Sequence, residues 1–158
     1  AIELRGIDTQ ASDRSFEVEG RAGVYSREAT DTLPTDDSNL STAYSEQDYD
    51  DVAESDDVRV NQFISDLNYG VHLFKYKNVN STDKILVHVE LRSDDAPADS
   101  PVFLQIYNRN TEEWETIDTD NTSPANTDFV LEAEVEENVE DYYDENNVVA
   151  ARVYQESI

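Results

Sequence analysis

Residues 102–117 read VFLQIYNRNTEEWETI, and this stretch indicates the fold class most clearly. Its apolar side chains recur at every second position, so that Val102, Leu104 and Ile106 share one face of an extended segment. The polar run NRNTE then interrupts the alternation, and a second extended run follows around Trp114. Two extended runs joined by a short polar connection predict a β-hairpin with the three aliphatic residues on its inner face.

Trp114 is the only tryptophan of the chain and permits two interpretations. Across the predicted hairpin it can stack on an aromatic or β-branched residue, which adds about 0.2–1 kcal/mol to the gain from burial. The simpler interpretation is therefore a core residue. The alternative is an exposed platform on which a sugar ring stacks.

Further runs along the chain have the same alternating character. In the segment 85–91, for example, Ile85, Val87, Val89 and Leu91 all face one way. The extended runs are predicted at residues 2–7, 16–25, 57–63, 69–76, 85–91, 102–107, 113–117, 128–135 and 147–155. Only NVEDYYDE, at 138–145, suggests a helical turn. The sequence therefore predicts an all-β fold, an antiparallel β-sandwich of the jelly-roll type.

The first part of the chain is less regular. Residues 26–57 are rich in Asp, Ser, Thr and Glu and have no sustained period, which predicts a long loop or arm. We therefore expect an extended N-terminal arm with short strands and an acidic loop over residues 1–43. The jelly-roll domain is expected over residues 44–158.

The charge of the chain is strongly unbalanced, with 37 acidic against 11 basic residues and a net charge of -26. The acids are spread over the loops and polar strand faces, as on a solvated surface. At about 1 M salt the screening length falls to about 3 Å, so such a surface is tolerated in brine. The composition thus favours a halophilic protein. Because the basic residues are scattered, neither nucleic acid nor a membrane surface is an expected partner.

Three stretches carry a resemblance to a known module. LQIYNRNTEEWETIDTDN, TDFVLEAEV and NVEDYYDENNVVAARVYQ resemble a jelly-roll β-sandwich found in virion structural proteins of tailed viruses, which is similar to galactose-binding-like and carbohydrate-binding modules. The resemblance extends over about residues 44–156. It implies attachment, capsid decoration or glycan contact rather than catalysis, and it transfers no set of functional residues.

The resemblance and the charge together lead to a functional expectation. The chain is expected to be a non-enzymatic virion structural protein of a haloarchaeal tailed virus, in a capsid turret, neck or tail, assembled in a high-salt host cytoplasm. Its expected partners are other virion proteins and copies of itself, as a trimer or higher oligomer. The alternative is a surface carbohydrate-binding or adhesion module of a halophile or its virus.

Candidate binding residues fall into two groups. Exposed aromatic rings could grip a host surface glycan, and the candidates are Trp114, Tyr107, Tyr142 and Tyr143. The densest run of carboxylates could hold structural calcium, which prefers six to eight oxygen ligands. Its candidate ligands are Asp48, Asp50, Asp51, Asp56 and Asp57. No other cofactor is expected.

The two histidines, His72 and His88, lie in predicted strands. They are expected to face solvent, with a cross-strand partial metal site as the alternative. The chain has no cysteine and no GxSxG-type nucleophile turn, so no residue pattern predicts an enzyme.

Overall fold

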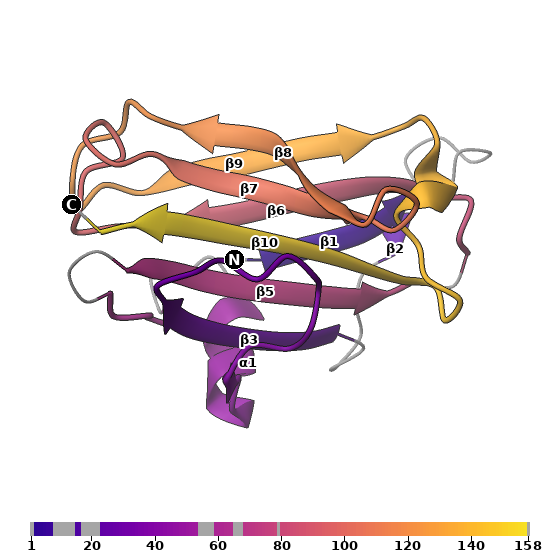
Figure 1. Ribbon diagram of the computed structural model, residues 1–158, viewed down its shortest axis with the longest axis horizontal. Coiled ribbons are helices and arrows are strands. Elements are labelled where there is room, and N and C mark those ends of the chain that lie inside the picture. The colour runs from indigo at the N-terminus through magenta and orange to yellow at the C-terminus, as the bar shows by residue number, and fades with distance from the viewer. Residues whose placement is uncertain are drawn as a thin grey trace.

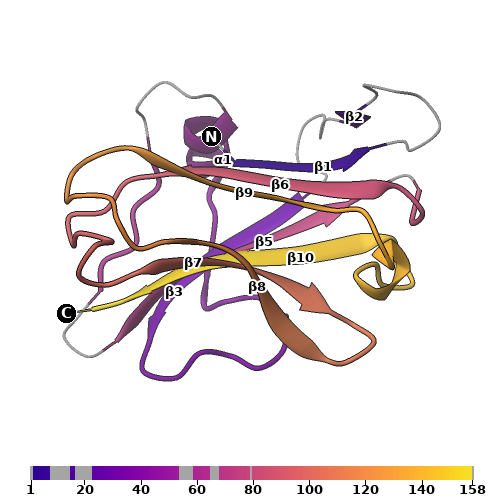
Figure 2. The ribbon, with the colours of Figure 1, turned by 90° about the horizontal axis from the view of Figure 1, so that it is seen from above.

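The computed structural model describes residues 2–7, 15–16, 23–53, 59–64, 68–78 and 80–157. These residues form two antiparallel β-sheets packed face to face (Figures 1 and 2), which confirms the predicted all-β sandwich. The strands are β1 (Ile2–Ile7), β2 (Ser15–Phe16), β3 (Gly23–Thr30), β4 (Thr42–Ala43), β5 (Tyr69–Lys77), β6 (Lys84–Leu91), β7 (Val102–Asn108), β8 (Glu113–Asp120), β9 (Phe129–Val135) and β10 (Val148–Glu156).

The strand order is that of a rolled-up hairpin. Within the described residues, the smaller sheet has the order β2-β1-β6-β9 and the larger sheet the order β4-β3-β5-β10-β7-β8. Three antiparallel pairs are nested, because β7 pairs with β8, β6 with β9, and β5 with β10. A strip of nested pairs that folds over into two facing sheets is the arrangement of a jelly roll.

Strands of the predicted arm belong to this sandwich. β1 pairs with β6 from Ile2↔Val89 to Ile7↔Lys84, and β3 pairs with β5 from Gly23↔Tyr76 to Thr30↔Tyr69. The other residues of the predicted arm before β3, which are 1, 8–14 and 17–22, lie outside the described residues. The prediction of one long loop over 26–57 is wrong, because β3 extends to Thr30 and a helix begins at Glu46.

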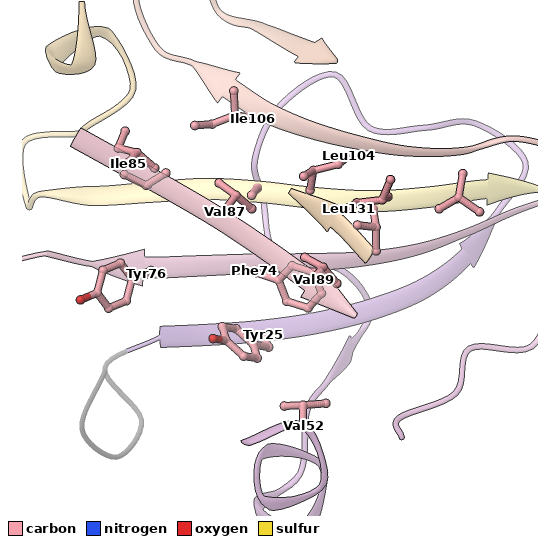
Figure 3. Packing of buried hydrophobic residues seen from close by; sticks show 14 of the residues in the cluster. Tyr25, Val52, Phe74, Tyr76, Ile85, Val87, Val89, Leu104, Ile106 and Leu131 are labelled. Atoms are coloured by element: carbon pink, nitrogen blue, oxygen red, sulfur yellow. The ribbon is translucent and has the colours of Figure 1, made fainter. Parts of the chain in front are cut away.

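This helix, α1 (Glu46–Ala53), contradicts the prediction that only residues 138–145 form a helical turn. A capping box begins it. The Ser45 hydroxyl accepts a hydrogen bond from the Asp48 backbone N–H at 3.1 Å, and the Asp48 carboxylate accepts one from the Ser45 N–H at 2.9 Å. At its other end Val52 is buried in the core below Tyr25 (Figure 3). No helix among the described residues has the length and apolar character needed to span a bilayer.

The main core lies between the two sheets (Figure 3). The smaller sheet contributes Ile85, Val87, Val89, Phe129 and Leu131, and the larger sheet contributes Phe74, Leu104, Ile106, Val149, Ala151 and Val153. In each strand these are alternate residues, as the period of two predicts. Around the core, the predicted turn at 138–145 contains a single turn of 3-10 helix, Val139–Asp141.

The hairpin of residues 102–117 is confirmed. Val102, Leu104 and Ile106 of β7 are buried on its inner face, and the connection to β8 closes with Glu112 in the left-handed region at φ 59°. The pairing shifts between Leu104 and Gln105, where β8 carries one extra residue. Trp114 lies opposite Tyr107, so the pair projects from the outer face of the larger sheet.

Candidate functional site

A second hydrophobic cluster, here called the outer cluster, lies on the outer face of the larger sheet. Its buried members are Leu40, Val71, Leu73, Tyr107 and Ala150, and Leu33, Tyr69, Trp114 and Tyr154 pack against them. The connection between β3 and β4, residues 31–41, supplies Leu33 and Leu40 and runs below the larger sheet in Figure 2. The larger sheet is therefore covered by apolar contacts on both faces.

Trp114 is a packing residue of this outer cluster and not of the main core. Its ring centroid lies 5.1 Å from that of Tyr107, and the Arg152 guanidinium carbon lies 4.2 Å from the Trp114 ring centroid. Its indole N–H donates a hydrogen bond to the Asp36 carbonyl at 3.2 Å. These contacts attach the 31–41 connection to the sheet.

The other aromatic residues predicted to bind glycan lie elsewhere. The Tyr142 hydroxyl donates to the Glu115 carboxylate at 2.5 Å, and its ring packs against the main core. Tyr143 is buried in that core, where its hydroxyl accepts a hydrogen bond from the Asn78 amide at 3.1 Å. The four predicted rings are therefore divided between two clusters and do not form one platform.

The predicted calcium ligands lie partly on α1. Asp48 caps the helix, Asp51 accepts a hydrogen bond from the Gln47 amide at 2.8 Å, and Asp50 is exposed. The remaining candidates, Asp56 and Asp57, lie outside the described residues. Among the residues that are described, no three acidic or histidine side chains come together in a group that could hold a metal ion. Calcium at residues 48–57 stays a prediction.

The two histidines lie in different sheets, which excludes the cross-strand site considered from the sequence. His88 on β6 contacts Glu132 on β9, at the outer face of the smaller sheet. His72 on β5 points instead toward the interior of the sandwich, where its ring stacks on Phe74. The prediction that both rings face solvent is therefore wrong for His72.

His72 lines a cleft of about 740 Å³ at one end of the sandwich, here called the end cleft. The cleft opens where β6 and β10 end and where β5, β7 and β9 begin. Its lining includes Val89, Val102, Phe129 and Val153 on the apolar side and Asn61, Gln62, Glu90, Arg92, Asp94 and Asn126 on the polar side. Through this cleft, core residues such as Val89 and Val153 line a surface opening.

One wall of the end cleft is the segment 59–64, here called the strap. The Arg59 guanidinium pairs with the Asp128 carboxylate at 2.6 Å, and the Arg27 guanidinium donates to the Gln62 side-chain oxygen at 3.0 Å. Ile64 packs onto Gly70, where an added Cβ would lie 2.6 Å from the Ile64 Cγ1 atom. The strap has no regular secondary structure, so the strand predicted at 57–63 is wrong over residues 59–63.

Another part of the rim is the connection between β6 and β7. Gln155, at the end of β10, donates hydrogen bonds to the carbonyls of Asp95 and Ser100 at 3.0 and 2.9 Å and accepts one from the Ser93 hydroxyl at 2.6 Å. The Asn126 N–H donates to the Ser93 carbonyl at 2.7 Å. This network fixes the shape of the rim before any ligand is present.

The inner wall carries a neutral hydrogen-bonding pair. The Tyr44 hydroxyl lies 2.5 Å from the His72 Nδ1 atom. Burial lowers the pKa of His72 to about 4 and raises the pKa of Tyr44, so both groups are uncharged near pH 7. Because the ring bonds through Nδ1, its Nε2 atom remains available to a ligand as far as the described residues show.

Comparison of the chain with protein-family models, with curated proteins and with solved structures finds no significant match. The fold and the end cleft therefore define the class of protein as an antiparallel β-sandwich with jelly-roll pairing and a cleft at one end. Sequence reasoning missed the cleft. A possible signal was Phe63, a large apolar residue within the polar stretch NQFIS.

Proposed function

We propose that the chain is a non-enzymatic structural protein in the virion of a tailed virus that infects a halophilic archaeon. It would decorate the capsid, as a turret does, or form part of the neck or tail. This proposal is supported by the distribution of charge on the β-sandwich, in which acidic side chains lie on the outer faces of the sheets and apolar side chains lie between them. On β9, for example, Glu132 and Glu134 are exposed while Phe129 and Leu131 between the sheets are buried.

Several basic residues, by contrast, are engaged in contacts that hold the fold together. Arg152 is buried, and both Arg109 and Lys75 reach the Asp37 carboxylate of the 31–41 connection, at 2.9 and 4.0 Å. Because these basic side chains are buried or half-buried, they contribute little to the outer surface, where exposed carboxylates such as Glu132 and Glu134 remain. Such a surface repels itself in dilute buffer and is screened in brine.

The salt dependence of stability tests the halophilic part of the proposal. We expect the melting temperature, followed by circular dichroism, to rise by about 10 °C or more between about 50 mM and about 3 M KCl. Equal melting temperatures at the two salt concentrations would remove this support.

The place of the chain in a particle tests the structural part. The proposed partners are other virion proteins and copies of the chain itself, in a trimer or higher oligomer. Mass spectrometry of purified virions should detect the chain in stoichiometric amounts. Gel filtration in about 3 M KCl should show an assembly, whereas a strict monomer absent from particles would refute the proposal.

A surface carbohydrate-binding or adhesion module is the second candidate function. The specific observation in its favour is the end cleft, beside which Phe63 is 84% exposed. A virion turret that also holds a host glycan would combine both functions.

A further inference from the structure

We infer that the end cleft binds a short oligosaccharide, with Phe63 as the ring on which one sugar stacks. This inference rests on the second candidate function and places its site away from the aromatic residues that the sequence suggested. Trp114 and Tyr107 belong to the outer cluster, and neither lines the end cleft.

The first observation is the exposure of Phe63. Its side chain is 84% exposed although it lies between Gln62 and Ile64, both of which are engaged in contacts that fix the strap. Single exposed apolar side chains are common, but this ring also belongs to the lining of a cleft, where a ligand can cover it. An aromatic face beside a cleft matches the C–H face of a sugar ring.

The second observation is the mixture of hydrogen-bonding groups around that ring. The strap contributes Asn61 to the lining, the connection between β6 and β7 contributes Asp94, and the inner wall contributes the neutral His72 ring. Sugar hydroxyls both donate and accept hydrogen bonds, so they need amides, carboxylates and donors within one cleft. The apolar floor, which includes Phe129, can receive the non-polar face of a second ring.

Other ligand classes fit this cleft less well. A nucleotide or nucleic acid requires clustered basic groups, but Arg59 is already paired with Asp128, and the lining also contains the acidic residues Glu90 and Asp94. A divalent cation requires converging carboxylates, and no such group of three is found within the described residues. A lipid tail requires apolar walls on all sides, which the rim does not provide.

The test is binding to a microarray of oligosaccharides of about two to four rings that includes neutral hexoses, N-acetylhexosamines and uronic acids, in about 3 M KCl. The affinity of the best ligand is then measured by titration calorimetry. We expect Phe63→Ala to weaken binding by at least about tenfold, equal to ~1.4 kcal/mol, and Phe63→Tyr to keep it within about threefold. Val24→Ala is the matched control, because Val24 is exposed but lies outside the lining of the cleft.

Three results would overturn the inference. The folded protein could bind none of these saccharides, its binding could be unchanged by Phe63→Ala, or Trp114→Phe could abolish binding while Phe63→Ala does not. Circular dichroism of each variant shows that it is folded. None of these results bears on whether the chain is found in virions, so failure here is distinguishable from failure of the structural role.

Discussion

Replacement of Arg152 by alanine should be among the most destabilising single changes to the larger sheet. The side chain is 5% exposed, its Nε atom donates to the Gln105 side-chain oxygen at 2.8 Å, and its Nη1 atom donates to the Pro34 carbonyl at 2.7 Å. Each charge-assisted hydrogen bond contributes about 1.5–3 kcal/mol, and the stack on Trp114 adds about 0.5–2 kcal/mol. Because these terms are not additive, we expect Arg152→Ala to lower the free energy of unfolding by about 3–5 kcal/mol.

Urea unfolding in about 3 M KCl, followed by the fluorescence of Trp114, measures this loss directly. The same loss corresponds to a fall of about 6–20 °C in melting temperature for a chain of this size. Arg152→Lys, which keeps the charge without the planar fork, should give an intermediate loss. Exposed Arg92 provides the control, since Arg92→Ala should change stability by less than about 0.5 kcal/mol. A shift for Arg152→Ala no larger than that of the control would refute the structural role of the buried guanidinium.

Three further perturbations follow from contacts of single side chains. Tyr143→Phe removes the hydroxyl that accepts a hydrogen bond from the buried Asn78 amide. Urea unfolding should therefore show that the free energy of unfolding falls by about 1–2 kcal/mol. Burial lowers the pKa of His72 from 6.5 to about 4, so the unfolded chain binds the proton first as the pH falls. The difference in free energy of unfolding between the wild type and His72→Gln should therefore be constant above pH 6.5. Between pH 6.5 and 4 the wild type should lose about 3 kcal/mol relative to the variant. A difference that does not change across that range would contradict the burial of the His72 ring. The Asp118 carboxylate accepts a hydrogen bond from the Glu132 backbone N–H at 2.9 Å and so joins the edges of the two sheets. Asp118→Ala should lower stability by about 1 kcal/mol and speed the hydrogen exchange of that amide, and unchanged exchange would show that the edge is held by other contacts.

The strands of the second half of the chain could be predicted because their burial follows a simple period. In β6 and β7 every second residue faces the other sheet, and the sequence alternates accordingly. The hairpin around residues 108–112 could be predicted for the same reason, since a polar connection separates two alternating runs.

Features that depend on distant partners could not be predicted in this way. The sequence around α1 is dominated by acids and suggested a loop, although Ser45 and Asp48 have the spacing of a capping box. The strap alternates like a strand, but Ile64 contacts the backbone of Gly70 and no neighbouring strand pairs with residues 59–64. Trp114 is a large apolar residue of the kind expected in a core. It packs on the outer face instead because the 31–41 connection, which is distant in sequence, covers it there.

The position of β10 has a consequence for how the chain acquires its structure during synthesis. This strand, Val148–Glu156, leaves the ribosome after the other described strands, yet it lies between β5 and β7 in the larger sheet. Until it emerges, two neighbouring strands expose unpaired backbone groups and apolar side chains to the cell interior. Completion of the larger sheet therefore waits for the final part of this sequence, and a chain truncated before Val148 should expose the facing edges of β5 and β7 and aggregate.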